Sequence, residues 1–436
     1  MKFGPGRLVL IPAVLLLTLL TSPLASSPAL AQPRGEAARS LAALAVQQAA
    51  LRPTDGRTFD RFGFSVAVSR DTAVVGAPRL RLGLSPAQGV VYVFTRSAGS
   101  WSLQQELTDG EARAGNQFGS AVAVDGDTLV VGAPDMILHA DEYGTDMRQG
   151  AAYVFARSGS VWKMQARLVA SDGAAEDRFG CAVALSGSTA VVGATQDWRA
   201  APNNRGVVYV FTRSGTAWSQ SQKLTALGGA ADDCFGCAVS LSGTTLAVGA
   251  WGKSGGETPR LSAYGRGAVY VFTRPASAWV QQQELAPAGG VGLEAFGSSV
   301  AVSADTLVAG APGNGLLPGY TNGAAYVFTR SGATWTQQAR LTDPGGSGSE
   351  RFGSSVAVAG DVAVVGATYA NLAADRGGRA FIFSRSASAW SLSQPLSTAA
   401  GWDFGQAVAL DGTTLLVGAP GVTGAAAGSA YVYVLR

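Results

Sequence analysis

The chain has 436 residues, of which 14% are charged, and its formal net charge at pH 7 is +3. Two of the basic residues, Lys2 and Arg7, lie in an N-terminal segment that we expect to be removed, which leaves a net charge of +1. A balance this close to neutral excludes the strongly basic surface of a typical nucleic-acid-binding protein. The low charged fraction is typical of a chain made largely of buried strands.

The N-terminal segment has the pattern of a secretory signal peptide. A short basic start is followed by the apolar run Leu8–Leu20 and by the small residues Ala29–Ala31, which favour cleavage before Gln32. The apolar run is shorter than the roughly 20 residues of a membrane-spanning helix, and no later stretch is apolar and long enough to cross a bilayer. We therefore expect a signal peptide over 1–31, a linker over 32–44, and a mature chain without a transmembrane segment, secreted to the periplasm, the cell surface or the medium.

One phrase recurs seven times along the rest of the chain. Each copy has a Phe-Gly pair, a Gly-Ala pair thirteen residues after the first glycine, and then an aromatic strand of the type VYVFTR. The phenylalanines are Phe62, Phe118, Phe179, Phe235, Phe296, Phe352 and Phe404. Six copies continue to a tryptophan, and these are Trp101, Trp162, Trp218, Trp279, Trp335 and Trp390.

Each copy is predicted to form four short antiparallel strands. Small and large residues alternate through Gly119–Val124, which is the period of a strand with two distinct faces. Asp-Gly pairs at Asp125 and Asp411 are signals for tight hairpins, because glycine tolerates positive φ. Repeats of about 50 to 60 residues with four strands are typical of propeller blades. The predicted fold class is therefore all-β, a seven-bladed β-propeller of four-stranded antiparallel blades over residues 45–436.

The two ends of the chain are predicted to share the last blade. The seventh copy stops at Arg436 without a tryptophan strand. The interval from Leu107 to Gly119, measured back from the first Phe-Gly pair, assigns the same position to Leu51. Ala45–Arg52 should therefore be the fourth strand of the seventh blade, which closes the ring and removes open strand edges. In such a ring the repeated Phe would fill the space between blades, and the Gly would let backbones approach near the axis.

The Phe-Gly and Gly-Ala-Pro elements resemble the FG-GAP repeats of the N-terminal propeller of integrin α subunits. Phe118–Pro134 carries the resemblance best, and it extends over nearly the whole mature chain. It implies a recognition or adhesion role, and it implies calcium loops of the type D-x-D-x-D-G between the first and second strands. Here that loop is a short turn with one or two carboxylates, whereas calcium takes about six to eight oxygen ligands. We therefore expect no metal site, and no cofactor.

The connections between second and third strands, and those between blades, should lie together on one face because the strands are antiparallel. Variable loops on a rigid scaffold are where binding usually resides, and aromatic and polar side chains suit a sugar or a peptide edge. In the alternative, these side chains pack on one another at the blade ends. The candidate ligand-binding residues are Asp135, His139, Asp141, Glu142, Tyr143, Trp198, Arg199, Trp251, Tyr264, Arg266, Tyr320 and Tyr369.

Two residues before each repeated Phe lies a hydrogen-bond acceptor in six of the seven copies. One hypothesis is a ring of oxygens at the channel mouth that could hold a cation or an amine. The repetition favours the alternative, in which each side chain caps its own loop by accepting backbone N–H groups. The positions are Asp60, Asn116, Asp177, Asp233, Glu294 and Glu350, with Trp402 in the seventh copy.

An arginine precedes the tight turn before each repeated tryptophan. Cross-strand stacking of Arg on Trp explains six such pairs without a ligand, and an anion-binding ring is the alternative. The arginines are Arg96, Arg157, Arg213, Arg274, Arg330 and Arg385.

Three cysteines, Cys181, Cys234 and Cys237, lie in one region. An odd number allows one disulfide and one free thiol in an exported protein. Cys181 and Cys237 hold the same repeat position in neighbouring copies, which favours a role as small core residues. Three cysteines without nearby histidines do not make a zinc site.

Signals for catalysis are few. The chain has one histidine and no G-x-S-x-G motif. Two facing carboxylates would suffice for a glycosidase, and Asp141 or Glu142 with Glu257 could be considered, but no spacing singles them out. The sequence favours a monomeric, non-catalytic binding or adhesion module that recognises an extracellular glycan or protein. The alternatives are a secreted hydrolase acting on polysaccharide or phosphodiester bonds and a purely structural surface repeat protein.

Overall fold

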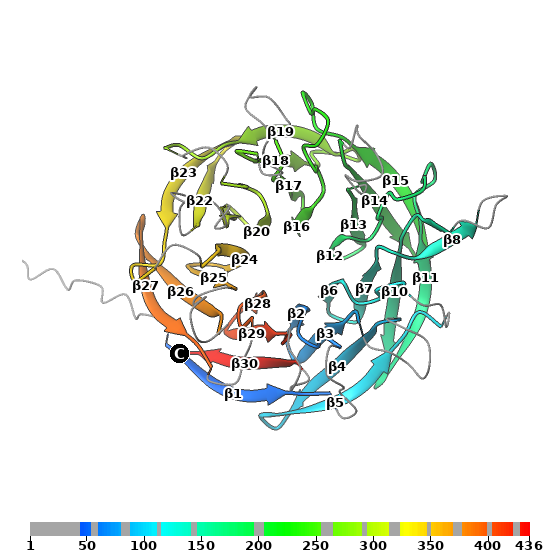
Figure 1. The fold of residues 1–436 in the computed structure, drawn as a ribbon, viewed down its shortest axis with the longest axis horizontal. Coiled ribbons are helices and arrows are strands. Elements are labelled where there is room, and N and C mark those ends of the chain that lie inside the picture. Colours follow the sequence, from blue (N-terminus) through cyan, green and yellow to red (C-terminus); the bar gives the residue numbers. More distant parts are fainter. Residues whose placement is uncertain are drawn as a thin grey trace, which may run out of the picture. The chain divides into compact units, whose positions relative to one another are not determined.

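Four-stranded antiparallel sheets recur seven times along the chain, as Figure 1 shows. The computed structural model describes residues 44–53, 60–79, 88–110, 115–140, 146–195, 205–253, 265–289, 294–313, 323–346, 350–368, 377–398, 403–421 and 428–436, with only the backbone at 138–140 and 146–147. The predicted signal peptide and most of the linker lie outside these ranges. No helix within them would span a membrane.

The strands of the first four blades follow one another in the chain. Blade 1 contains β2 (Ser65–Ser69), β3 (Thr72–Ala77), β4 (Val90–Ser97) and β5 (Ser100–Leu107). Blade 2 contains β6 (Ala121–Asp125), β7 (Thr128–Ala133), β10 (Ala151–Ser158) and β11 (Val161–Leu168). Blade 3 contains β12 (Ala182–Ser186), β13 (Thr189–Ala194), β14 (Val207–Ser214) and β15 (Ala217–Leu224). Blade 4 contains β16 (Ala238–Ser242), β17 (Thr245–Ala250), β18 (Ala268–Thr273) and β19 (Val280–Leu285).

The last three blades follow the same plan, except that the seventh takes its fourth strand from the other end of the chain. Blade 5 contains β20 (Ser299–Ser303), β21 (Thr306–Ala311), β22 (Ala324–Ser331) and β23 (Thr334–Leu341). Blade 6 contains β24 (Phe352–Ala359), β25 (Val362–Ala367), β26 (Arg379–Ser386) and β27 (Ala389–Leu396). Blade 7 contains β28 (Ala407–Asp411), β29 (Thr414–Ala419), β30 (Ser429–Leu435) and β1 (Ala45–Leu51).

The ring closes as the sequence predicts. β1 pairs antiparallel with β30, from Ala45 opposite Leu435 to Leu51 opposite Ala430. The innermost strand of each blade contacts that of the next, and β28 of blade 7 contacts β2 of blade 1. Figure 1 shows these strands around the centre and the fourth strands on the outside. The prediction that the N-terminal strand completes the last blade is confirmed.

The repeated phenylalanines fill the space between neighbouring blades. Phe62 is fully buried and meets Tyr92 and Phe94 of its own blade edge-on, with ring centroids 5.2 and 6.2 Å apart. The same apolar cluster includes Leu416 and Val432 of blade 7. Edge-to-face aromatic pairs add to the free energy gained from burial. This position therefore joins blades, as its repetition indicates.

The repeated glycines allow the second strand of one blade to approach closely the segment that leads into the innermost strand of the next. A Cβ atom on Gly249, in the Gly-Ala pair of blade 4, would lie 2.0 Å from the carbonyl oxygen of Gly297 in blade 5. Gly76 has the same relation to Gly119, at 2.2 Å. No side chain fits at these distances, so the Gly-Ala pair of one blade requires glycine because of the Phe-Gly pair of the next.

One element departs from the four-stranded plan. The connection between β7 and β10 contains a small hairpin of β8 (Ile137–Ala140) and β9 (Asp146–Arg148), which the sequence did not indicate. Its strands pair with each other and belong to a separate two-stranded sheet.

Candidate functional site

The antiparallel blades give the propeller two different faces. The turns between first and second strands and between third and fourth strands make up what we call the hairpin face. The connections between second and third strands, and those between blades, make up the loop face. The connections from second to third strands are residues 78–89, 134–150, 195–206, 251–267, 312–323, 368–378 and 420–428.

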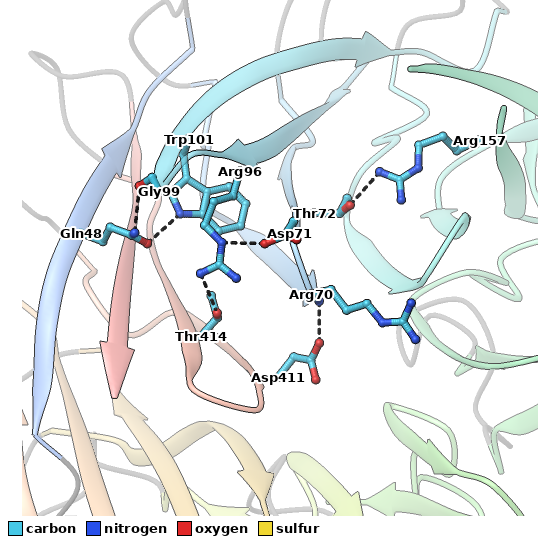
Figure 2. Close-up of polar contacts among 10 residues, drawn as sticks. All are labelled: Gln48, Arg70, Asp71, Thr72, Arg96, Gly99, Trp101, Arg157, Asp411 and Thr414. Atoms are coloured by element: carbon cyan, nitrogen blue, oxygen red, sulfur yellow. Dashed lines mark hydrogen bonds and ion pairs between the residues drawn. The ribbon is translucent and has the colours of Figure 1, made fainter. Parts of the chain in front are cut away.

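Side chains on the hairpin face join neighbouring blades through repeated contacts. Arg96 lies over the ring of Trp101 at 5.3 Å, and its Nε donates to Asp71 Oδ1 at 2.7 Å. Its Nη1 donates to Thr414 Oγ1 of blade 7 at 3.4 Å (Figure 2). The same bond across a blade junction is made by Arg157 to Thr72, Arg213 to Thr128, Arg274 to Thr189, Arg330 to Thr245 and Arg385 to Thr306.

The predicted stacking of arginine on tryptophan is confirmed in all six copies, at 5.1 to 5.6 Å. The bond to threonine was not predicted. A sequence signal for it exists, because the second strand begins with threonine in every blade except blade 6, where Val362 stands.

A β-bulge in the outer strand pair gives five of the six tryptophans a second partner, the exception being Trp279, whose indole N–H is buried without one among the described residues. Between β4 and β5 the register shifts so that Gln104 has no opposite residue. A bulge re-aims the extra side chain, and Gln104 Oε1 accepts the indole N–H of Trp162 in the next blade at 3.0 Å. Equivalent bonds run from Trp101 to Gln48 (Figure 2), Trp218 to Gln165, Trp335 to Gln282 and Trp390 to Gln338.

The turns on the hairpin face do not fit a calcium ion. Their aspartates, such as Asp71 and Asp127, are held by the guanidinium groups of Arg96 and Arg157. Calcium requires several more oxygen ligands than one such carboxylate supplies. Within the part of the chain that the structure describes, no three His, Cys, Asp or Glu side chains are grouped so that they could hold a metal ion.

On the loop face, the structure describes the surroundings of three candidate residues. Asp135 accepts a hydrogen bond from Gln117 Nε2, and Arg178 of the next blade-to-blade connection lies 3.8 Å from its carboxylate. Trp251 follows β17 and is half-buried, whereas Arg266 is exposed and its carbonyl accepts the N–H of Phe296. His139 lies in β8, where only the backbone is described. Asp141, Glu142, Tyr143, Trp198, Arg199, Tyr264, Tyr320 and Tyr369 lie outside the described residues.

Tyrosine hydroxyls of three neighbouring blades lie in clusters of paired charges next to the loop face. Asp172 accepts bonds from Tyr209 Oη at 2.9 Å and Lys223 Nζ at 2.5 Å. The bond from Lys223 holds the pKa of Asp172 below its usual value. The charges of Asp172 and Lys223 neutralise each other. Because Asp172 lies in the connection between blades 2 and 3, its bonds to Tyr209 and Lys223 attach that connection to blade 3.

Blades 4 and 5 repeat this arrangement with different residues. Lys253 Nζ donates to Tyr270 Oη at 2.5 Å and lies 3.0 Å from a carboxylate oxygen of Glu284. Burial alone would lower the pKa of Lys253, but these two partners raise it. In blade 5, Tyr326 Oη donates to Glu294 Oε2 at 2.8 Å and accepts from Arg340 Nε at 3.3 Å. Sequence reasoning missed these clusters, although the charged residues opposite the repeated tyrosine were a usable signal.

The acceptors placed before each Phe-Gly pair are buried side chains. Asp177 Oδ2 accepts the N–H of Ala174 at 2.6 Å, and Asp233 Oδ2 accepts the N–H of Ala230 at 2.7 Å. Burial raises the pKa of Asp233. A carboxylate that accepts an N–H three residues earlier has the geometry of a loop cap. Trp402 lies outside the described residues, and the other positions, all nine-tenths or more buried, are Asp60, Asn116, Glu294 and Glu350.

The three cysteines are free thiols near the start of the innermost strands of blades 3 and 4. Cys181 Sγ lies 3.4 Å from the carbonyl oxygen of Gly193, and Cys237 Sγ lies 3.7 Å from that of Gly297. In blade 5 the same position is Ser298, whose hydroxyl donates to a backbone carbonyl. The two thiols therefore take the place of serine hydroxyls. Burial raises the pKa of both thiols, which leaves them protonated and weakly reactive.

The fold and its repeated contacts define a seven-bladed propeller of the kind found in integrin α subunits. Seven segments match the FG-GAP repeat, and they are residues 45–94, 101–155, 162–211, 218–272, 279–328, 335–383 and 397–433. These segments make up most of the chain, which belongs to the FG-GAP repeat family. Most of them begin at the fourth strand of one blade and end in the third strand of the next. A comparison with curated proteins finds no match.

Proposed function

We propose that this chain is a secreted, non-catalytic binding or adhesion module that recognises a glycan or a protein ligand through its loop face. One observation carries the proposal. Repeated side chains on the hairpin face bond to one another across the blade junctions, whereas the loop-face connections differ between blades in both length and sequence. Residues that repeat stabilise the contacts between blades, so we assign ligand binding to the residues that do not repeat.

The longest connections point to blades 2 and 4 as the main contributors. Residues 134–150 and 251–267 are longer than 78–89 or 195–206, and they contain Asp135, Trp251 and Arg266. An exposed guanidinium and a half-buried indole offer hydrogen bonds and a flat apolar surface, which suits a sugar ring or a peptide edge. The remaining candidates, His139, Asp141, Glu142, Tyr143, Trp198, Arg199, Tyr264, Tyr320 and Tyr369, belong to the same proposal.

The buried acceptors have a different role in this proposal. Asp60, Asp177, Asp233, Glu294 and Glu350 hold the connections between blades in shape, and ligand binding does not use them as a cation site. Binding should therefore be independent of calcium.

The test is binding of the secreted protein to a broad glycan array, with calcium and with EDTA. We expect specific binding that persists in EDTA. A variant in which 134–150 and 251–267 are replaced by the shorter connection 195–206 should lose that binding. Substitution Asp127→Asn on the hairpin face should retain it and serves as the matched control.

Other outcomes would point to the competing functions. Loss of binding in EDTA would contradict the assignment of the turns as unfit for calcium. Turnover of a bound polysaccharide would favour a hydrolase. A loop-replacement variant that changes only stability would favour a structural role. Sequencing the N-terminus of exported protein tests secretion, and we expect it to begin at Gln32.

A further inference from the structure

The seven junctions between neighbouring blades are not equivalent on the hairpin face. Three polar contacts recur there: arginine to threonine, tryptophan to the bulge glutamine, and a turn N–H to the last side chain of the preceding blade's first strand. All three form between blades 7 and 1, as Figure 2 shows. They are Arg96 Nη1 to Thr414 Oγ1 at 3.4 Å, Trp101 Nε1 to Gln48 Oε1 at 3.0 Å, and Arg70 N to Asp411 Oδ2 at 2.6 Å.

The next two junctions repeat the full set. Between blades 1 and 2 the contacts are Arg157 to Thr72, Trp162 to Gln104 and Gly126 N to Ser69, at 2.9, 3.0 and 3.2 Å. Between blades 2 and 3 they are Arg213 to Thr128, Trp218 to Gln165 and Gly187 N to Asp125, at 3.0, 2.8 and 2.7 Å. The arginine contact continues through blade 6, with Arg274, Arg330 and Arg385. The tryptophan bond recurs at Trp335 and Trp390, but it is absent between blades 3 and 4, where the bulge residue is Ser221 and the buried Trp279 Nε1 has no partner in the part of the chain that the structure describes.

Between blades 6 and 7 every one of these positions has changed. The arginine position is Leu435, and the threonine position facing it is Val362. The tryptophan position is Ala45, opposite Leu435, and the bulge position facing it is Ser393. The last residue of the first strand in blade 6 is Ala359, which has no side-chain acceptor to offer the turn of blade 7.

What remains at this junction is mostly apolar packing. Leu435, Ala45 and Val362 belong to one cluster with Phe404, which is fully buried and meets Tyr431 at 5.6 Å as in the other blades. Gln394 adds two bonds to the backbone of Ala45, at 2.8 and 3.4 Å. The same pair of backbone bonds joins Gln105 to Trp162 between blades 1 and 2. The inner part of the junction is therefore like the others, and the outer part keeps this backbone contact but lacks all three of the side-chain contacts described above.

Polar contacts depend on the distance and direction between their groups, whereas apolar contacts tolerate small displacements of the packed surfaces. A hydrogen bond or a cation–π contact is lost when its groups move by a few ångströms, and each of the six other junctions keeps at least the arginine–threonine bond. Blade 7 keeps its full set of contacts on the side of blade 1. A local opening of the ring would follow the path with the fewest such contacts.

We propose that the ring of this protein opens at one place, the junction between blades 6 and 7, while blade 7 stays attached to blade 1. Such a seam is a conformational device built into the fold, and it goes beyond the proposed binding function. It gives blades 6 and 7 a freedom of relative movement that the other neighbouring blades do not have.

Hydrogen exchange of the full chain, followed by mass spectrometry of peptides, tests the proposal. The reporters are β27 and the turn Asp411–Thr414 at the seam, compared with β11 and the turn Ser186–Thr189 between blades 2 and 3. We expect the seam reporters to exchange at least ~10-fold faster. Equal rates at both junctions would overturn the proposal. Fast exchange at the turn Ser69–Thr72 as well would also overturn it, because blade 7 would then be loose on both sides.

Two matched sets of substitutions test whether these contacts determine where the ring opens. Val362→Thr, Leu435→Arg, Ala45→Trp and Ser393→Gln together install the repeated contacts between blades 6 and 7, and exchange there should slow to the rate between blades 2 and 3. The converse set Thr128→Val, Arg213→Leu, Trp218→Ala and Gln165→Ser should create a second fast junction. If the first variant does not fold because of the larger side chain at Ala45, the converse set still tests whether these contacts control exchange at a junction. Unchanged rates in it would contradict the role given to these contacts.

Discussion

The hairpin face and the loop face are built on the same backbone plan and use their side chains in different ways. On the hairpin face, a charged group reaches across a blade junction, as Arg330 does to Thr245. On the loop face, charged groups pair next to the connection they support, as Lys253 and Glu284 do within blade 4. The first pattern repeats and the second changes from blade to blade. Repetition therefore marks residues that assemble the ring, and variation marks the surface that is available for a ligand.

The strongest way to break this comparison is to disturb the close approach of blades near the axis. Gly249→Ala places a methyl group where the carbonyl oxygen of Gly297 lies 2.0 Å away, so backbone must shift. We expect a loss of about 3 kcal/mol or more in the free energy of unfolding. Gly187→Ala is the control, because its Cβ would point into open space at φ +57° and should cost only about 1 to 2 kcal/mol. Equal losses in urea denaturation would show that the interblade contact does not matter.

A smaller effect is expected from the contacts between blades on the hairpin face. Arg330→Met removes the bond to Thr245 and the contact over Trp335, and we expect a loss of about 1 to 2 kcal/mol. A double-mutant cycle with Thr245→Val should give a coupling energy of about 0.5 to 1 kcal/mol.

The control for this cycle comes from the loop face. Arg148 in β9 is exposed, and Arg148→Met should change stability by less than about 0.5 kcal/mol. If the cycle shows additive effects of Arg330 and Thr245, the arginine acts within its own blade and the contrast between the faces is weaker than we infer.

Most of the fold was predictable because the residues that the blade structure requires recur at fixed spacing in all seven repeats. The spacing of Phe62 and Gly76 locates the inner strands, and the interval to Leu51 locates the strand that closes the ring. The bond from Arg96 to Thr414 was not predicted. It depends on the rotation between neighbouring blades, which a strand pattern does not encode. A comparison of copies would have revealed it, since Leu435 and Val362 depart from the pattern together.

The candidate site was less predictable for a physical reason. The loop-face residues do not repeat, so no spacing relates Asp135 to Trp251 or to Arg266. Local interactions decide their surroundings, and the contact of Arg178 with Asp135 brings together two connections from different blades. The buried acceptors were easier to interpret. Asp177 and Asp233 accept N–H groups three residues earlier, which is a relation within the local sequence.

The smallest expected effect concerns Asp172, next to the loop face, whose contribution to stability depends on pH. The bond from Lys223 holds the pKa of this carboxyl below 3.8, so its contribution to stability is present above that pH and is lost as the pH falls through the lowered value. The carboxylate is half exposed, so solvent screening keeps this contribution small. In Lys223→Met, NMR titration should show the pKa of Asp172 moving up toward 3.8, with little change in thermal stability near neutral pH. A large loss of stability would instead show that this cluster, like the arginines of the opposite face, helps to hold the blades together.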